Sequence, residues 1–209
     1  MTSDTPAPAA GPGSVRPGGR TARVRAAVLD AAGDALAEHG FARLDLADVA
    51  RRANVGKTTV YRRWGTVTKL VADLLVDMAE QSLPRSETGT LLGDLTANAR
   101  LVQRTLRDPR QGPLFTAVIA AATWDPRTER ALRQFYDVRI DEWAPCVEQA
   151  IDRGEVPPDT DPREVVRAVS APLYYRLLIS GEPLDEAAAD RAATATVAAA
   201  RAGAYRRSL

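Results

Sequence analysis

The chain has 209 residues, of which 26% are charged and 45% hydrophobic, a composition typical of a soluble globular protein. Its net charge of +1 hides an asymmetry: residues 1–70 carry 11 Lys and Arg against 6 Asp and Glu, a surplus of +5, and the rest carries 17 against 21, a surplus of −4. No apolar stretch is long enough to cross a bilayer, no secretory signal begins the chain, and a lone cysteine, Cys146, excludes an internal disulfide, so the sequence predicts a cytoplasmic protein without a membrane partner.

The first 20 residues are rich in Pro, Gly, Ala, Ser and Thr and contain only two large apolar residues. Such a segment cannot bury enough surface to offset the entropy of ordering, which predicts a disordered tail over 1–20. Four arginines cluster where it ends, and the segment could act as an arm that reaches DNA: Arg16, Arg20, Arg23 and Arg25.

From residue 21 onward, apolar residues recur at helical spacing and no stretch alternates as a strand would. The pattern predicts nine helices over about 24–39, 45–53, 57–64, 67–81, 91–106, 113–122, 126–153, 162–180 and 185–201. Asp45, Asp125 and Asp161 are predicted N-caps, and Pro145 and Pro172 are expected to kink the helices that contain them. The predicted fold is all-α, with a helix-turn-helix domain over 21–66 and a larger helical domain over 67–209, connected by the helix at 67–82.

The most informative segment is 45–64, which predicts two short helices joined by a three-residue turn at 54–56. Apolar residues occur only where these helices would face each other and the first helix: Val49, Ala50, Ala53, Val55, Val60 and Trp64. The other face of the second helix carries six hydrogen-bond donors in seven positions: Lys57, Thr58, Thr59, Tyr61, Arg62 and Arg63. This pattern is typical of a helix-turn-helix that reads DNA, although a short surface helix with solvated cations would also account for the charges.

In these residues the sequence resembles the tetracycline-repressor (TetR) family of transcriptional regulators. The resemblance covers about residues 21–75 and rests on Phe41 after His39-Gly40, on the runs 48–50, 53–56 and 57–64, and on Leu70. A second block, 172–178 with 181–185, resembles one branch of the family's C-terminal domains. The resemblance implies about nine helices, a homodimer formed by the last two long helices, a double-stranded DNA operator, and a C-terminal pocket for a small-molecule effector.

The resemblance also implies roles for single residues. Base edges would be read by Lys57, Thr58 and Arg63, and phosphates would be held by Thr59, Tyr61, Arg62 and the amides of the first helix. Arg20, Arg23 and Lys69 are further candidates for contacts with DNA.

Three positions depart from the family pattern. Asn54 stands where the family usually has Gly, and Asn is the residue next best able to adopt a left-handed conformation. Gly56 stands where Ser or Thr usually caps the recognition helix. Val67 stands where a Lys often touches DNA, and Lys69 lies two positions further on and therefore on another face.

Aromatic residues concentrate in the C-terminal part, and for any single one a place in the core is the simpler interpretation. The functional interpretation is that some line a cavity for a mainly apolar or aromatic ligand, with these candidates: Phe115, Trp124, Tyr136, Arg139, Trp143, Tyr174 and Tyr175. Small residues on the last helix would allow close packing against a second copy: Ala187, Ala188, Ala192, Ala195, Ala199 and Ala200.

No catalytic set is predicted, because the chain has one histidine, His39, and no glycine-rich phosphate loop outside the tail. We expect no metal and no cofactor. The leading hypothesis is a ligand-responsive repressor. The alternatives are a helical small-molecule or partner-binding protein with little sequence-specific DNA binding and, less favoured by the absence of convergent acids and bases, an enzyme.

Overall fold

The computed structural model describes residues 18–81 and 85–207. Within these ranges the prediction of an all-α fold with nine α-helices is confirmed, and the only β-type pairing is an isolated bridge between Thr160 and Arg206. The α-helices are α1 (Gly18–His39), α2 (Leu46–Arg52), α3 (Lys57–Arg63), α4 (Val67–Glu80), α5 (Leu91–Arg107), α6 (Gln111–Ala122), α7 (Pro126–Asp152), α8 (Pro162–Tyr175) and α9 (Glu186–Arg201). Two short turns complete the chain, the 3-10 helix η1 (Phe41–Arg43) and the π-helix η2 (Arg176–Ser180).

The helices begin where the sequence predicts caps. The side chains of Asp45, Asp125 and Asp161 each accept two backbone N–H groups from the first turn of α2, α7 and α8, respectively. These bonds satisfy donors that have no partner within the helix. A local feature, the N-cap aspartate, therefore determines where each of the three helices begins.

One boundary differs from the prediction, and one helix changes its hydrogen-bonding pattern before its predicted end. Helix α1 already begins at Gly18, so residues 18–20 are helical rather than part of a disordered tail, and Arg20 is presented from a helix. The predicted tail over 1–17, including Arg16, lies outside the described residues. At the other end, the helix that contains Pro172 changes to π-helical hydrogen bonding after Tyr175 and stops at Gly181, whose φ of +64° suits glycine.

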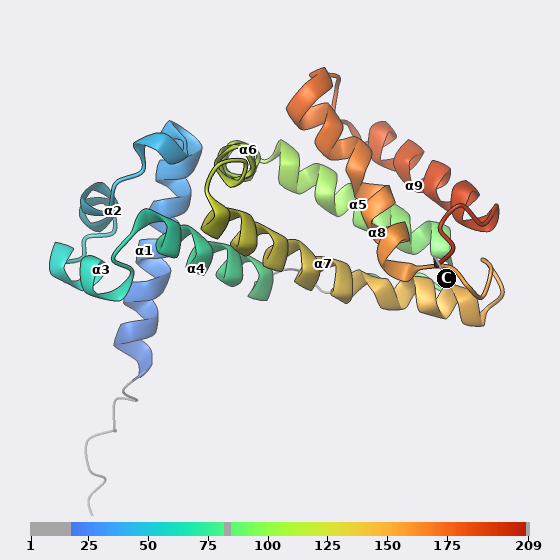
Figure 1. Ribbon diagram of the computed structural model, residues 1–209, viewed down its shortest axis with the longest axis horizontal. Helices are drawn as coiled ribbons and strands as arrows, with labels where there is room; N and C mark the ends of the chain where they lie inside the picture. The colour runs from blue at the N-terminus through green and yellow to red at the C-terminus, as the bar shows by residue number, and fades with distance from the viewer. Residues whose placement is uncertain (1–17, 82–84, 208–209) are drawn as a thin grey trace, which may run out of the picture.

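The helices form an elongated molecule whose long axis is horizontal in Figure 1. The end formed by α1, α2 and α3 lies opposite the end formed by α5, α8 and α9. Helix α4 packs against both α1 and α7, and α7 continues toward α8. Helices α4 and α7 therefore connect the two ends.

Most of the apolar surface of α9 is buried within its own chain. Helix α9 packs against α5 and α8, and this contact buries Ala188, Ala192 and Ala200. These three alanines, which the sequence suggested as contacts with a second copy, therefore belong to the core. Ala187 and Ala195 remain exposed.

Candidate nucleic-acid interface and internal cavity

The turn between α2 and α3 is fixed by backbone hydrogen bonds. Asn54 adopts a left-handed conformation with φ of +53°, the N–H of Asn54 donates to the carbonyl of Arg51, and the N–H of Val55 donates to that of Ala50 over 2.9 Å. This 6→1 and 5→2 pattern closes a helix at a left-handed residue. Asparagine thus adopts the conformation for which the family usually has glycine, as the sequence predicts.

Helix α3 begins without a side-chain cap. Gly56 occupies the N-cap position with extended backbone angles, and no side chain accepts from the first turn. The N–H of Thr59 donates to the carbonyl of Gly56 over 2.9 Å, and among the described residues the N–H groups of Lys57 and Thr58 remain open to an external acceptor, such as a phosphate oxygen.

A small apolar core holds α3 in place. Val60 is the one fully buried residue of α3, and Trp64 at its end is 4% exposed. The indole Nε1 of Trp64 donates to Oδ2 of Asp73 over 2.9 Å, which connects the end of α3 to α4. The helix therefore has little freedom to rotate and expose a different face.

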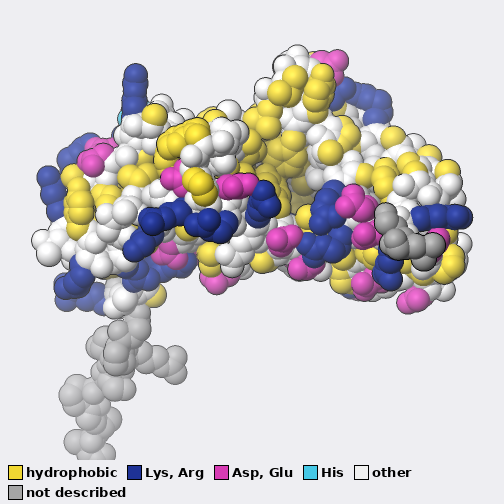
Figure 2. Space-filling model, in the orientation of Figure 1, with side chains coloured by type: hydrophobic (Ala, Val, Ile, Leu, Met, Phe, Trp, Pro, Cys, Tyr) yellow, Lys and Arg dark blue, Asp and Glu magenta, His cyan; other side chains and the backbone are white. Residues whose placement is uncertain are grey.

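The outward face of α3 presents the predicted donors. Five of the six are exposed and Thr59 is half-buried; the Tyr61 ring is 47% exposed. Within the described residues, Lys57, Arg62 and Arg63 form no ion pair, and the guanidinium of Arg63 lies 5.1 Å from the centroid of the Trp64 ring. On the face drawn in Figure 2, Lys and Arg side chains surround this end of the molecule.

The structure brings several candidate DNA contacts into one groove. The start of α1 and the start of α3 form its walls, and it is lined by Arg20, Thr59, Arg62 and Arg63 among others. Lys57, Thr58, Tyr61 and Lys69 are outside this lining, as is Arg23, whose Nε donates to the carbonyl of Gly19 over 3.1 Å. The N–H of Lys69 donates to the Thr66 hydroxyl that caps α4.

One arginine of the predicted arm has a structural role. Arg25 donates hydrogen bonds to the carboxylates of Asp73 and Asp77 on α4, and its bond to Asp73 is the main reason that the pKa of Arg25 is raised. Burial opposes ionisation of Asp73, but hydrogen bonds from Arg25 and Trp64 outweigh it and lower the pKa of that carboxyl. Arg25 is therefore occupied within the molecule, contrary to its expected place in a DNA-binding cluster.

A cavity of about 380 Å³ lies in the larger domain. Its walls come from α1, α4, α5, α6, α7 and α8, and Figure 2 shows a hollow with a largely hydrophobic wall between the two ends of the molecule. Five of the seven predicted ligand residues are in the lining: Phe115, Tyr136, Arg139, Trp143 and Tyr174.

The other two predicted ligand residues lie elsewhere. Trp124 is 64% exposed and packs edge-on against Phe41 of η1 at 5.7 Å between ring centroids, so it connects the two domains. Tyr175 is 58% exposed because it follows Tyr174 on α8, and consecutive helical residues point about 100° apart. Neither side chain lines the cavity.

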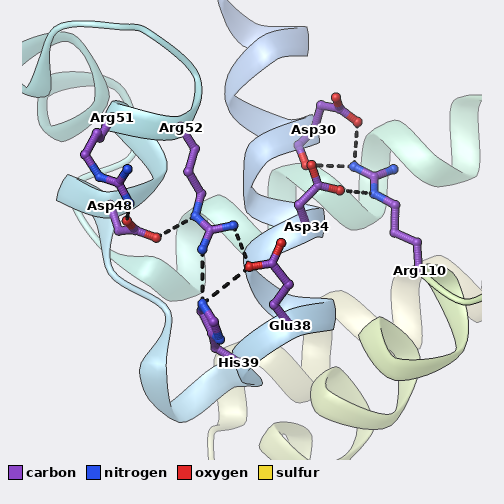
Figure 3. A network of polar contacts seen from close by, with 8 residues as sticks. All are labelled: Asp30, Asp34, Glu38, His39, Asp48, Arg51, Arg52 and Arg110. Atoms are coloured by element: carbon purple, nitrogen blue, oxygen red, sulfur yellow. Dashed lines mark hydrogen bonds and ion pairs between the residues drawn. The ribbon is translucent and has the colours of Figure 1, made fainter.

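An arginine connects the cavity wall to α1, as Figure 3 shows. Arg110, just before α6, donates from Nη2 to the backbone carbonyl and carboxylate of Asp30 and from Nε to Asp34. Gly33 makes room for this contact, because a Cβ there would lie 3.0 Å from the guanidinium. Both Gly33 and Arg110 also line the cavity.

A second polar network in Figure 3 stabilises the helix-turn-helix itself. Arg52 on α2 donates to Asp48 of its own helix and to Glu38 at the end of α1, and its Nη2 lies 3.0 Å from Nε2 of His39. His39 is thus the last residue of α1 and a neighbour of this network.

Models of two protein families match the chain. The family described as "Bacterial regulatory proteins, tetR family" matches residues 28–74, and "Tetracyclin repressor-like, C-terminal domain" matches residues 85–196. The chain belongs to the TetR family of transcriptional regulators. As a TetR-family member it is a DNA-binding helix-turn-helix regulator, and the resemblance noted in the sequence is confirmed.

Similar regulators support this assignment over most of the chain. The chain is 33% identical to the transcriptional regulator AqdR of Rhodococcus erythropolis over 70% of either chain. It is 30% identical to the DNA-binding transcriptional repressor TetR of Mycobacteroides abscessus, over 78% of this chain and 85% of the relative. The crystal structure of the TetR family transcription regulator SCO0332 superposes with a TM-score of 0.68 at 33% identity, covering 84% of this chain and 97% of the other.

No helix among the described residues is long and apolar enough to span a membrane, and no cluster of potential metal ligands is found among them.

The cavity lining includes residues that the sequence did not suggest, among them Asn98, Gly33 and Arg110. A signal existed for two of them: Asn98 interrupts the apolar stripe of α5, and Gly33 interrupts the helical pattern of α1, where an isolated glycine often has a packing reason.

Proposed function

We propose that this TetR-family regulator is a repressor that binds a palindromic operator as a homodimer and is released by a small, mainly apolar or aromatic molecule. It would act in the cytoplasm, where bacterial DNA lies, and it would catalyse no reaction. The observation that carries the DNA-binding part is the outward face of α3, whose cations have no carboxylate partner among the described residues although the helix is anchored by buried Val60 and Trp64.

The two sets of donors on this surface would have different tasks. Lys57 and Thr58 at the start of α3, with Arg63, would reach base edges, since N-terminal residues of a recognition helix face the bases in the major groove. Thr59, Tyr61 and Arg62 would hold phosphates, joined by Arg20 across the shared groove. Arg23 and Lys69, both exposed, would add contacts with the flanking backbone.

A homodimer is required to present two recognition helices to one operator. Exposed apolar side chains gather at the end of α8 and in η2, where Tyr175, Leu178 and Ile179 face solvent. Burying them against a second copy would be favourable, and the exposed small residues Ala187 and Ala195 of α9 would allow close approach. The two α3 helices would then lie about 34 Å apart, or a multiple of this spacing.

Release by an effector would act through the shared walls of the cavity. Gly33 of α1 and Leu74 and Met78 of α4 line it together with residues of α5 to α8. An occupant that fits one arrangement of these helices better than another shifts the population toward it, and α1 and α4 carry that shift to α3.

The test begins with selection of bound DNA from a random pool by the full chain, followed by affinity measurements on the selected site at several salt concentrations. We expect a palindromic site, two chains per DNA and a steep loss of affinity with salt, because neutralised phosphates release counterions. Arg62→Ala should reduce the salt slope by about one.

Arg207→Ala provides a matched control, because Arg207 is an exposed arginine near the C-terminus, at the opposite end from α3. It should leave the affinity and the slope unchanged. Weak binding with little dependence on salt, or one chain per DNA, would contradict the proposal and favour a helical small-molecule-binding protein.

A further inference from the structure

The cavity lining contains polar atoms that nothing in the described structure satisfies. Three buried side-chain atoms of lining residues have no hydrogen-bond partner among the described residues: Oδ1 of Asn98 on α5, the hydroxyl of Tyr136 and Nε1 of Trp143, both on α7. The side chains of Asn98 and Trp143 are almost fully buried, at 4% and 2% exposure. Native proteins pair the great majority of such groups, because an unsatisfied buried donor or acceptor is destabilising.

Solvent does not reach these three atoms either, so water cannot satisfy them from outside. The hydroxyl of Tyr174 is the polar neighbour of that of Tyr136, and a hydrogen-bond interaction between the two contributes to their pKa values, although the pair falls outside strict hydrogen-bond geometry. Burial raises the pKa of both tyrosines, so both hydroxyls stay protonated at neutral pH. The unsatisfied set therefore comprises a donor in Trp143, an acceptor in Asn98 and a group in Tyr136 that can act as either.

Aromatic rings form the wall beside these atoms. Phe115 of α6 contacts Phe135 at 5.5 Å between centroids, Phe135 contacts Tyr136 at 5.3 Å, and Tyr136 contacts Tyr174 of α8 at 5.7 Å. All four rings line the cavity. A flat ring inserted here would meet ring edges and faces in the tilted geometries that aromatic groups favour.

The charged residues of the lining are already neutralised. Arg110 pairs with Asp30 and Asp34, and Arg139 pairs with Glu142. The part of the lining formed by described residues contains no Asp, Glu, Lys or His. An ionised ligand would lose its hydration without gaining an unpaired counterion, which disfavours anions and cations alike.

We propose that the effector is an uncharged aromatic compound that carries at least one hydrogen-bond donor and one acceptor, which engage Trp143, Tyr136 and Asn98. This inference rests on the proposed role of the cavity as the effector site, and it specifies the chemistry of that site. Binding requires these three side chains to turn toward the ligand, because their polar atoms are shielded from solvent in the described structure. The volume of about 380 Å³, roughly that of a dozen water molecules, accommodates a compound of two or three fused rings with substituents.

Four naphthalene probes of similar size test this chemistry by calorimetric titration into the full chain without DNA. They are 1-naphthol with a donor and an acceptor, 1-methoxynaphthalene with an acceptor only, naphthalene with neither, and 1-naphthoate with a negative charge. We expect affinity to fall in that order, by about two- to tenfold for each lost hydrogen bond.

Two variants locate the polar contacts. Tyr136→Phe and Trp143→Phe remove one polar group each and keep an aromatic ring, and each should weaken 1-naphthol by about two- to tenfold while leaving naphthalene unchanged. Tyr136→Phe should unfold at about the same temperature as the parent, because it removes one hydroxyl and keeps the ring. Trp143→Phe also leaves a space in the core and should lower the unfolding temperature, so its probe affinities are measured at a temperature at which both proteins are folded. A side chain with only a structural role would weaken 1-naphthol and naphthalene equally.

Tyr205→Phe and Trp124→Phe are matched controls, since neither residue lines the cavity, and they should change no probe affinity. Equal binding of all four probes, no binding of 1-naphthol, preference for 1-naphthoate, or equal effects of the cavity and control variants would overturn the inference. Binding to selected DNA, measured separately, distinguishes this failure from failure of the regulator proposal.

Discussion

Two buried tryptophans, one in each domain, differ in how their indole N–H groups are used. That of Trp64 in the DNA-binding domain donates to Asp73 over 2.9 Å, and that of Trp143 beside the cavity donates to no described residue. The difference indicates that the polar groups around the helix-turn-helix are satisfied within the protein, here by a carboxylate of α4. Beside the cavity, the N–H of Trp143 has no partner among the described residues, and the proposed effector would supply one.

The two regions also differ in whether their cations are paired with carboxylates, and here the unpaired groups lie in the DNA-binding domain. The cations of α3 lie in solvent and have no carboxylate partner in the part of the chain that the structure describes, whereas the two arginines of the cavity lining are paired. Water stabilises an exposed cation until a phosphate replaces it, whereas a partly buried one needs a counterion within the protein. A surface for a polyanion and a site for a neutral molecule therefore need contrasting arrangements.

The largest expected effect is the difference between two identical substitutions. Trp64→Phe and Trp143→Phe remove the same volume, but only the first breaks a hydrogen bond to a carboxylate. We expect the free energy of unfolding to fall by about 1.5–3 kcal/mol more for Trp64→Phe than for Trp143→Phe. Urea unfolding monitored by circular dichroism measures both, and equal losses would remove the contrast between the two domains.

The next effect separates the two kinds of donor on α3. Lys57→Ala should cost about 1–3 kcal/mol on the selected operator and relax preference at one base position. Tyr61→Phe should weaken binding to all DNA to a smaller extent, since it removes a contact that positions the protein. Affinity measurements on the operator and on single-base variants test this, and unchanged affinity of Tyr61→Phe would exclude its phosphate contact.

Acid should weaken the contact of α1 with α4 through Asp73. The folded pKa of Asp73 lies below its unfolded value, so its carboxylate stabilises the fold above about pH 4, and this stabilisation is lost as the pH falls through the folded pKa. Asp73→Asn should cost about 1–2 kcal/mol at pH 7 and should reduce the loss of stability between pH 5 and pH 3. Urea midpoints of both proteins across this range provide the comparison, and parallel pH curves would contradict it.

The smallest effect concerns the contact between Gly33 of α1 and Arg110 at the cavity wall. Gly33→Ala should gain up to about 1 kcal/mol of helix stability, offset by displacement of the Arg110 guanidinium, which would lie 3.0 Å from the new Cβ. In an Arg110→Met background the gain should be larger by a few tenths of a kcal/mol, since exposed ion pairs contribute up to about 1 kcal/mol. A double-mutant cycle with purely additive effects would show that Gly33 does not accommodate Arg110.

The sequence alone determined the elements and the recognition surface, because both depend on neighbours close along the chain. Helical periodicity predicted the nine helices, Asp45, Asp125 and Asp161 fixed three of their starts, and Asn54 marked the left-handed turn. The donors of α3 could be assigned to one face because a single short helix has only one apolar side. Local rules suffice for such features.

Tertiary structure decided what the side chains of distant helices do together. Tyr174 and Tyr175 are alike in sequence, but only the first meets Tyr136 of α7 across the cavity. Arg25 was expected near DNA but faces two carboxylates 48 and 52 positions away, and Trp124 packs on Phe41. Pairings over such separations depend on how helices pack against one another, and helical periodicity specifies which face is apolar but not which neighbour covers it.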